Sequence, residues 1–172
     1  MFQHLSGNNP RQILGNEKGM SLIEILIVIS IIALTLTSLF GLTSFSLSAM
    51  NLTKQTYEAN NIAQELMEQA RSFRDSTNWS TSGLGILTTS TDYYIQKSGS
   101  PEKWQFVEGT EIIDDFTRKI VLESVQRDGA DNIVEMGGAL DSNTKKVTVT
   151  VSWREKNKTH QVELITYLTN WR

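Results

Sequence analysis

The sequence predicts an α+β fold in which one long N-terminal helix packs on a small antiparallel β-sheet head. An uncharged apolar run extends from Ile25 to Phe40, and a helical period continues beyond it as far as Phe73. Near the C-terminus, an alternating segment from Lys146 to Trp153 is followed by a second β-rich run. A helix and an antiparallel sheet that each carry one apolar face bury those faces against each other.

The predominantly apolar segment 20–42, which contains this run, is long enough to cross a membrane, because about 20 helical residues at 1.5 Å each span a hydrocarbon core of ~30 Å. Glu24 is its one ionisable residue, and an unpaired charge in a membrane helix costs roughly 2.5–3.5 kcal/mol on insertion scales. The preceding tail, residues 1–19, is net basic, which favours a cytoplasmic location for it. We therefore expect the residues after Leu42 to lie outside the cytoplasm.

The segment Gly19-Met20-Ser21-Leu22-Ile23-Glu24 resembles the processing site of the type IV prepilins, in which a short basic leader ends in Gly and an apolar helix follows. Phe is commonest in the family at the position of Met20. The resemblance implies that prepilin peptidase, a membrane aspartyl peptidase, cuts between Gly19 and Met20 and methylates the new amine of Met20. It also implies assembly with other pilin or pseudopilin subunits at an inner-membrane assembly platform.

The order of these segments agrees with this resemblance. An ordinary secretory signal loses its apolar run, because the small-residue cleavage site follows that run. Here Gly19 precedes the apolar run, so cleavage would keep it in the mature chain. The amine of Met20 would then pair with Glu24 of a neighbouring copy, and such a pair is strong in a low-dielectric setting. The alternative is an uncleaved signal anchor with Glu24 near the lipid headgroups.

Composition excludes several other classes of protein. The chain of 172 residues has a net charge of −3, which gives no reason to expect a nucleic-acid partner. With 0 cysteines it forms no disulfide, and with 2 histidines, His4 in the leader and His160, it lacks the residues of most zinc and nucleophilic sites. We therefore expect no enzyme activity, no metal and no cofactor.

Residues 43–75 read as an amphipathic continuation of the membrane helix, residues 20–42. The alternative is a separate helix after a break at Gly41 or Ser44. Gly41 lies among hydroxylated residues that weaken a helix, so this stretch is a candidate for local melting on assembly, or for close helix contact. The predicted apolar stripe and polar face follow steps of three and four residues. The stripe comprises Phe45, Ala49, Leu52, Thr56, Ala59, Ala63, Leu66, Ala70 and Phe73, and the polar face Lys54, Glu58, Asn61, Glu65, Glu68 and Ser72.

Residues 76–172 form the predicted head. Strands are expected at 93–96, 104–107, 116–126, 146–153 and 161–171, with the last two joined as a hairpin. A polar loop is expected from Arg127 to Thr144. Its side chains are compatible either with a calcium site or with a solvated acidic loop, although their spacing matches no standard calcium loop. These side chains are Asp128, Asp131, Asn132, Asp141 and Asn143.

A second, less specific resemblance concerns the segments 59–68, 151–153 and 166–171. They look like those of PilV-type minor pilins and I-type minor pseudopilins of type II secretion, which join the complex that starts assembly and caps the tip. The resemblance implies an inner-membrane subunit that later enters a periplasmic or extracellular filament. The alternatives are a major pilin, and an adhesive or DNA-binding pilin whose head grips a surface or substrate. A membrane-tethered enzyme would need a titratable cluster that the sequence lacks.

Overall fold

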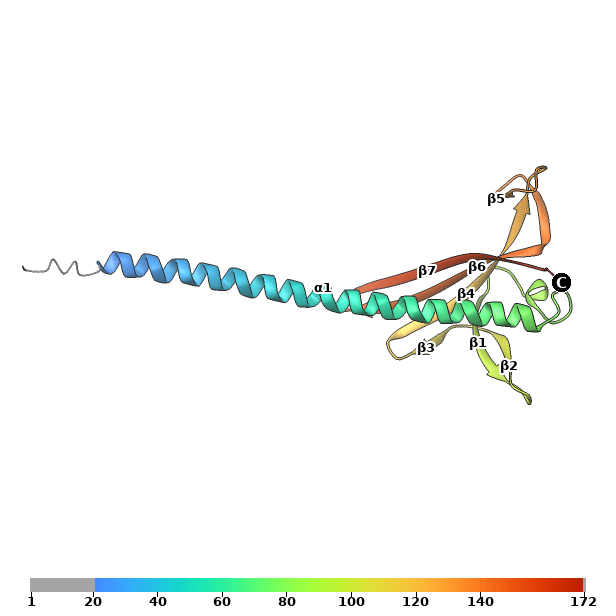
Figure 1. Ribbon diagram of the computed structural model, residues 1–172, viewed down its shortest axis with the longest axis horizontal. Helices are drawn as coiled ribbons and strands as arrows, with labels where there is room; N and C mark the ends of the chain where they lie inside the picture. The colour runs from blue at the N-terminus through green and yellow to red at the C-terminus, as the bar shows by residue number, and fades with distance from the viewer. Residues whose placement is uncertain (1–20, 172) are drawn as a thin grey trace, which may run out of the picture. The chain divides into compact units, whose positions relative to one another are not determined.

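The computed structural model describes residues 21–171 of the chain. One helix, α1 (Leu22–Ser76), is followed by a 3₁₀ turn, η1 (Leu84–Ile86), and then by the strands. The strands are β1 (Asp92–Ser98), β2 (Lys103–Glu108), β3 (Glu111–Ile113), β4 (Phe116–Arg127), β5 (Ile133–Val134), β6 (Ala139–Glu155) and β7 (Lys158–Thr169) (Figure 1). This is the predicted α+β pilin fold, a long N-terminal helix packed on an antiparallel sheet.

The chain divides into two compact units, residues 1–47 and 48–172. Helix α1 is unbroken through Gly41, so the structure does not contain the break considered at Gly41 or Ser44. A Cβ added at Gly41 would meet no atom within 4 Å. Two hydroxyl groups near it donate to carbonyls one turn back, that of Ser38 to Leu34 at 2.9 Å and that of Thr43 to Leu39 at 2.9 Å. Local melting in an assembly stays a prediction.

All pairs of strands in the second unit are antiparallel, and the main path of the sheet is β2-β1-β4-β6-β7. One edge of β4 pairs along its length with β6. Three short segments pair with other parts of β4: β3 at 116–118, β1 at 120–121 and β5 at 126–127. A shift in register between Ser124 and Val125 marks a bulge where β4 approaches β5.

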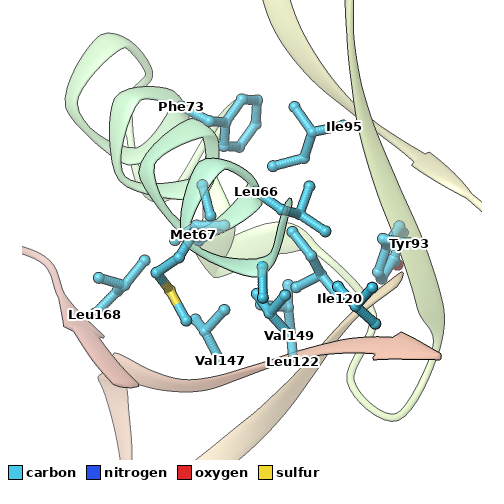
Figure 2. Close-up of a cluster of buried hydrophobic side chains, with 14 of the residues drawn as sticks. Leu66, Met67, Phe73, Tyr93, Ile95, Ile120, Leu122, Val147, Val149 and Leu168 are labelled. Carbon is cyan, nitrogen blue, oxygen red and sulfur yellow. The ribbon is translucent and has the colours of Figure 1, made fainter. Parts of the chain in front are cut away.

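The core of the second unit lies between the later turns of α1 and one face of this sheet (Figure 2). In the helix, burial follows the predicted stripe only from Leu52 onward, while Phe45 and Ala49 are exposed. Every residue of the predicted polar face is exposed, as expected. The fully buried side chains include Leu66 of α1 and the inward-facing residues of β4 and β6, namely Ile120, Leu122, Val147, Val149 and Val151.

Two indole groups fix the direction of β6 along α1. Near the start of β6, Trp79 Nε1, from the loop after α1, donates to the Ser142 carbonyl at 3.0 Å. Near its end, Trp153 Nε1 donates to Gln55 Oε1 at 3.2 Å. Strand β6 therefore runs antiparallel to the part of α1 that belongs to the second unit, and the turn between β6 and β7 lies at the Ser48 end of that unit (Figure 1).

The predicted strands are present, with corrected bounds. The segment 161–171 is shifted, since β7 starts at Lys158 and ends at Thr169. The predicted loop from Arg127 to Thr144 is wrong in part, because it contains β5 and the first residues of β6. Strand β3 was not predicted. These short strands form because β4 is long enough to offer backbone partners along both of its edges.

Candidate functional site

Glu24 lies in the first turn of α1, where its charge is favourably placed relative to the helix dipole. The Ser21 carbonyl accepts hydrogen bonds from the backbone N–H groups of Glu24, at 2.9 Å, and Ile25, at 3.3 Å, and so begins the helix. The Glu24 side chain is exposed, and among residues 21–171 it has no ion-pair or hydrogen-bond partner. The carboxylate is therefore available to a group outside the described chain.

The apolar side chains around Glu24 are exposed as well. Within α1, the most apolar window of 18 residues has a mean hydropathy of 2.6 and is 0% buried, so length and composition make this the one described helix able to span a membrane. Leu22, Phe40 and Phe45 are each more than two-thirds exposed. Hydroxyl groups from Ser30 to Thr43 donate to carbonyls of the same helix, as Ser30 Oγ does to the Leu26 carbonyl at 2.7 Å. A surface of this kind requires lipid or other helices as its surroundings.

The predicted cleavage and methylation residues, Gly19 and Met20, lie outside the described residues. Glu24 is therefore the one predicted site residue whose surroundings the structure gives. The start of α1 after Ser21 was not predicted, although a Ser directly before an apolar helical run is a known signal for a helix start.

The acidic loop between β4 and β6 uses its carboxylates internally. Asp128 Oδ1 accepts from the backbone N–H groups of Asn132 and Ala130, each at 2.9 Å. The bonds from the backbone and side chain of Asn132, followed by the one from Ala130, hold the pKa of Asp128 below its ordinary value. Asp141 binds Arg127 at 2.7 Å, which is the main reason that the pKa of Asp141 is lowered. Among residues 21–171, no three His, Asp or Glu side chains converge on a point where a metal would bind.

His160 is not part of a catalytic cluster in the described chain. Its ring stacks on Trp153 with 5.6 Å between ring centroids, and its Nε2 lies 3.9 Å from Glu155 Oε2. A cavity of about 450 Å³ lies between the end of α1 and the end of β7. Its lining contains hydroxyl, amide and indole groups and one cation, Arg74, which binds Asp75 at 2.8 Å. This lining has no acid, base or nucleophile arranged for catalysis.

Residues 14–40 match the family model described as the prokaryotic N-terminal methylation motif. The matched segment contains Gly19, Met20 and Glu24, and it ends within the exposed apolar part of α1. No curated protein and no solved structure matches the chain. Proteins with this motif are processed by prepilin peptidase, are anchored in the inner membrane and assemble with pilins as structural subunits, not as enzymes.

Proposed function

We propose that this type IV pilin-like subunit is a minor pilin or pseudopilin, built into the complex that starts a filament or caps its tip. In this proposal, prepilin peptidase cleaves between Gly19 and Met20 and methylates Met20. One observation carries the proposal: the motif matched at residues 14–40 continues into the exposed apolar segment of α1, residues 22–47, whose single carboxylate, Glu24, has no partner within residues 21–171.

Glu24 has a physical role in this assembly. While the subunit is in the membrane, its apolar segment contacts lipid, and in a filament the same surface contacts other helices, so burial alone discriminates little between the two states. A carboxylate left without a partner in an apolar setting is costly, and the new amine of Met20 on a neighbouring copy would offset that cost. Pairing across copies therefore favours the assembled state.

The first experiment determines the N-terminus of the mature chain by mass spectrometry. We expect the chain to begin at Met20 with one methyl group on its amine, because cleavage at Gly19 removes the leader and keeps the apolar helix. A mature chain that begins at Met1, or one that begins beyond Phe40, would contradict the proposal.

The second experiment replaces Glu24 by Ala. Cleavage and methylation should be largely unchanged, while the number of copies in purified filaments should fall by about tenfold or more, as for the loss of an interaction of ~1.4 kcal/mol or more. Quantitative immunoblotting of membranes and filaments measures both. Glu58→Ala is the matched control, because Glu58 is also exposed on α1 and has no partner among the described residues. Normal incorporation of the Glu24→Ala chain would refute the role of Glu24.

The minor role is supported by the sequence resemblance at residues 59–68, 151–153 and 166–171. A minor subunit should be present in few copies per filament, and its deletion should reduce the number of filaments more than its abundance would suggest. Counting copies by quantitative mass spectrometry, with the deletion strain alongside, tests this. If the chain makes up the bulk of the filament, it is a major pilin instead.

A further inference from the structure

The turn between β6 and β7 carries cations that no group in the described part of the chain binds. We call Arg154, Lys156 and Lys158 the basic turn. All three side chains are exposed, and none has an ion-pair or hydrogen-bond partner among residues 21–171. The acid within the turn, Glu155, faces His160 at 3.9 Å instead. Several cations elsewhere in the head are bound to acids, namely Lys119 to Asp92 at 3.0 Å, Arg127 to Asp141 at 2.7 Å and Lys146 to Glu123 at 2.8 Å. Lys97 instead lies over the ring of Trp104, 4.8 Å from its centroid.

The basic turn lies at the Ser48 end of the second unit. This is the end at which the chain arrives from its apolar segment. Trp153 is fixed beside Gln55 by the 3.2 Å hydrogen bond, and the turn is three to four residues further on, about 10–13 Å along a strand. This length corresponds to about seven to nine helical residues toward the N-terminus. The basic turn therefore reaches about the level of Ser48, where the second unit begins.

An acidic turn, Asp114 and Asp115, joins β3 to β4 at the same end of the sheet. The pairing of β4 with β6 stops at Phe116 and Trp153, whereas β6 and β7 continue their pairing to Glu155 and Lys158. The basic turn therefore extends about two residues, or ~7 Å, beyond the acidic one. A surface that approaches this end of the head meets the cations first.

We propose that the basic turn binds anionic phospholipid headgroups on the outer face of the membrane before the subunit leaves the bilayer. This inference rests on the proposed function in one respect, that the apolar segment of α1 lies in the membrane. Only six residues join Leu42, where the predicted membrane segment ends, to Ser48, and as part of α1 they span about 9 Å. This connection keeps the Ser48 end of the second unit near the membrane surface at any angle between the two units. The headgroup layer is ~5–8 Å thick, so flexible lysine and arginine side chains at this level reach lipid phosphates.

The contact is electrostatic, and its size can be estimated. Each Lys or Arg near an anionic membrane surface increases binding about fivefold, and salt weakens the effect because the Debye length is ~8 Å at physiological ionic strength. Three cations together would hold the head down against the bilayer. Entry into a filament would then have to break this contact, which makes the lipid composition of the membrane a factor in the release of the subunit.

The test uses the full chain in phosphatidylcholine vesicles with and without phosphatidylglycerol. The chain has 0 cysteines, so Asn157→Cys places a single nitroxide label in the turn. We expect a water-soluble relaxation agent to reach this label less in the phosphatidylglycerol vesicles, and salt to remove the difference. In the K156Q/K158Q chain, docking of the turn should weaken about 25-fold. A label introduced by Asn132→Cys, in the loop before β5, should be insensitive to lipid.

K97Q/K103Q is the control, because it removes the same charge from two exposed lysines beside a different turn, the one between β1 and β2. Equal accessibility of the Asn157 label in both kinds of vesicle, or an equal effect of the control variant, would overturn the inference. A label placed by Leu34→Cys reports insertion of the helix. If that label is in the bilayer while the accessibility of the Asn157 label does not depend on the lipid, this inference alone fails. If it is in water, the proposed function fails as well.

Discussion

Trp79 is the residue on which the loop after α1 depends. Its side chain is buried, and its indole donates to the Ser142 carbonyl at 3.0 Å. The backbone of Gly85 passes so close that a Cβ there would lie 2.6 Å from the indole Cδ1 and 2.6 Å from the Trp79 carbonyl oxygen. Glycine is required at this position by lack of space.

Gly85→Ala should therefore lower the free energy of unfolding by about 1–3 kcal/mol, the usual cost of forcing an extra carbon into a packed site. Thermal or chemical unfolding of the detergent-solubilised chain measures this. Gly129→Ala is the matched control, because a Cβ there would meet no atom within 4 Å, and it should change stability little or raise it by about 0.4–1 kcal/mol. Equal stability of the two variants would show that the loop adapts freely.

Asp141 gives the head a pH dependence at low pH. Its pKa is lowered, first by the hydrogen bond from Arg127 and then by the one from Thr144. A carboxyl whose pKa is lower in the folded state than in the unfolded chain stabilises the fold above its ordinary pKa of ~3.9, and this contribution is lost as the pH falls below that value.

We therefore expect the contribution of the Asp141 contact to the free energy of unfolding to be constant from neutral pH down to about pH 5. Below about pH 4 this contribution should be lost. Asp141→Asn should be less stable than the natural chain at pH 7, and the difference between the two should shrink as the pH falls through this range. Melting temperatures of both chains, measured across pH 2.5–7, test whether this difference shrinks. A difference that stays constant over this range would mean that the charge of Asp141 contributes nothing.

At the scale of elements, helix α1 could be predicted because the spacing of its apolar residues follows the helical period. Steps of three and four residues place Ala59, Ala63, Leu66 and Ala70 on one stripe, and all four are buried. The same period includes Phe45, which is 72% exposed, since periodicity indicates which side of a helix is apolar but not how far the sheet extends along it. To predict which residues of the helix are buried, one must therefore also know how far the sheet extends along it.

Strand β6 was predicted only where apolar residues alternate, from Lys146 onward. Its first part, residues 139–145, is polar and irregular, and it pairs with β4 through the backbone across a bulge at Ser124 and Val125. The side-chain ion pair between Arg127 of β4 and Asp141 of β6 also stabilises this pairing. A strand held by its partner's backbone leaves no pattern of its own in the sequence, which explains why it was missed.

Arg118 shows a signal that sequence reasoning could have used. It lies in phase with Phe116, Ile120 and Leu122 on the buried face of β4, and it is itself 5% exposed. A cation in such a position requires acids nearby. The structure supplies Glu111 at 2.7 Å from Nη2 and Glu65 of α1 at 4.0 Å from Nη1. The interruption of an apolar alternation by Arg118 thus predicts a charged partner.

At the scale of the whole molecule, the chain consists of two units with different requirements. The N-terminal unit contributes no buried side chain to the described core, which is made of residues from 59 to 168. Its proposed site residues, Glu24 within residues 21–171 and Gly19 and Met20 before them, were predicted from the sequence motif alone and stay predictions. The basic turn was not, because its significance depends on which cations are paired and on where β6 ends, and neither is visible in the sequence.

The division into units predicts that residues 48–172 fold without the rest. This fragment keeps every residue of the core cluster and the bond between Trp153 and Gln55, and it lacks the apolar segment that needs lipid. We expect it to be soluble without detergent and to unfold cooperatively, as measured by circular dichroism and denaturant titration.

A fragment of residues 64–172 is the comparison, because it loses Ala59 and Ala63, both 0% exposed, and the bond to Gln55. It should be less stable by several kcal/mol, as for other losses of well-packed core contacts. Equal stability of the two fragments would mean that the first turns of the helix in this unit do not support the sheet.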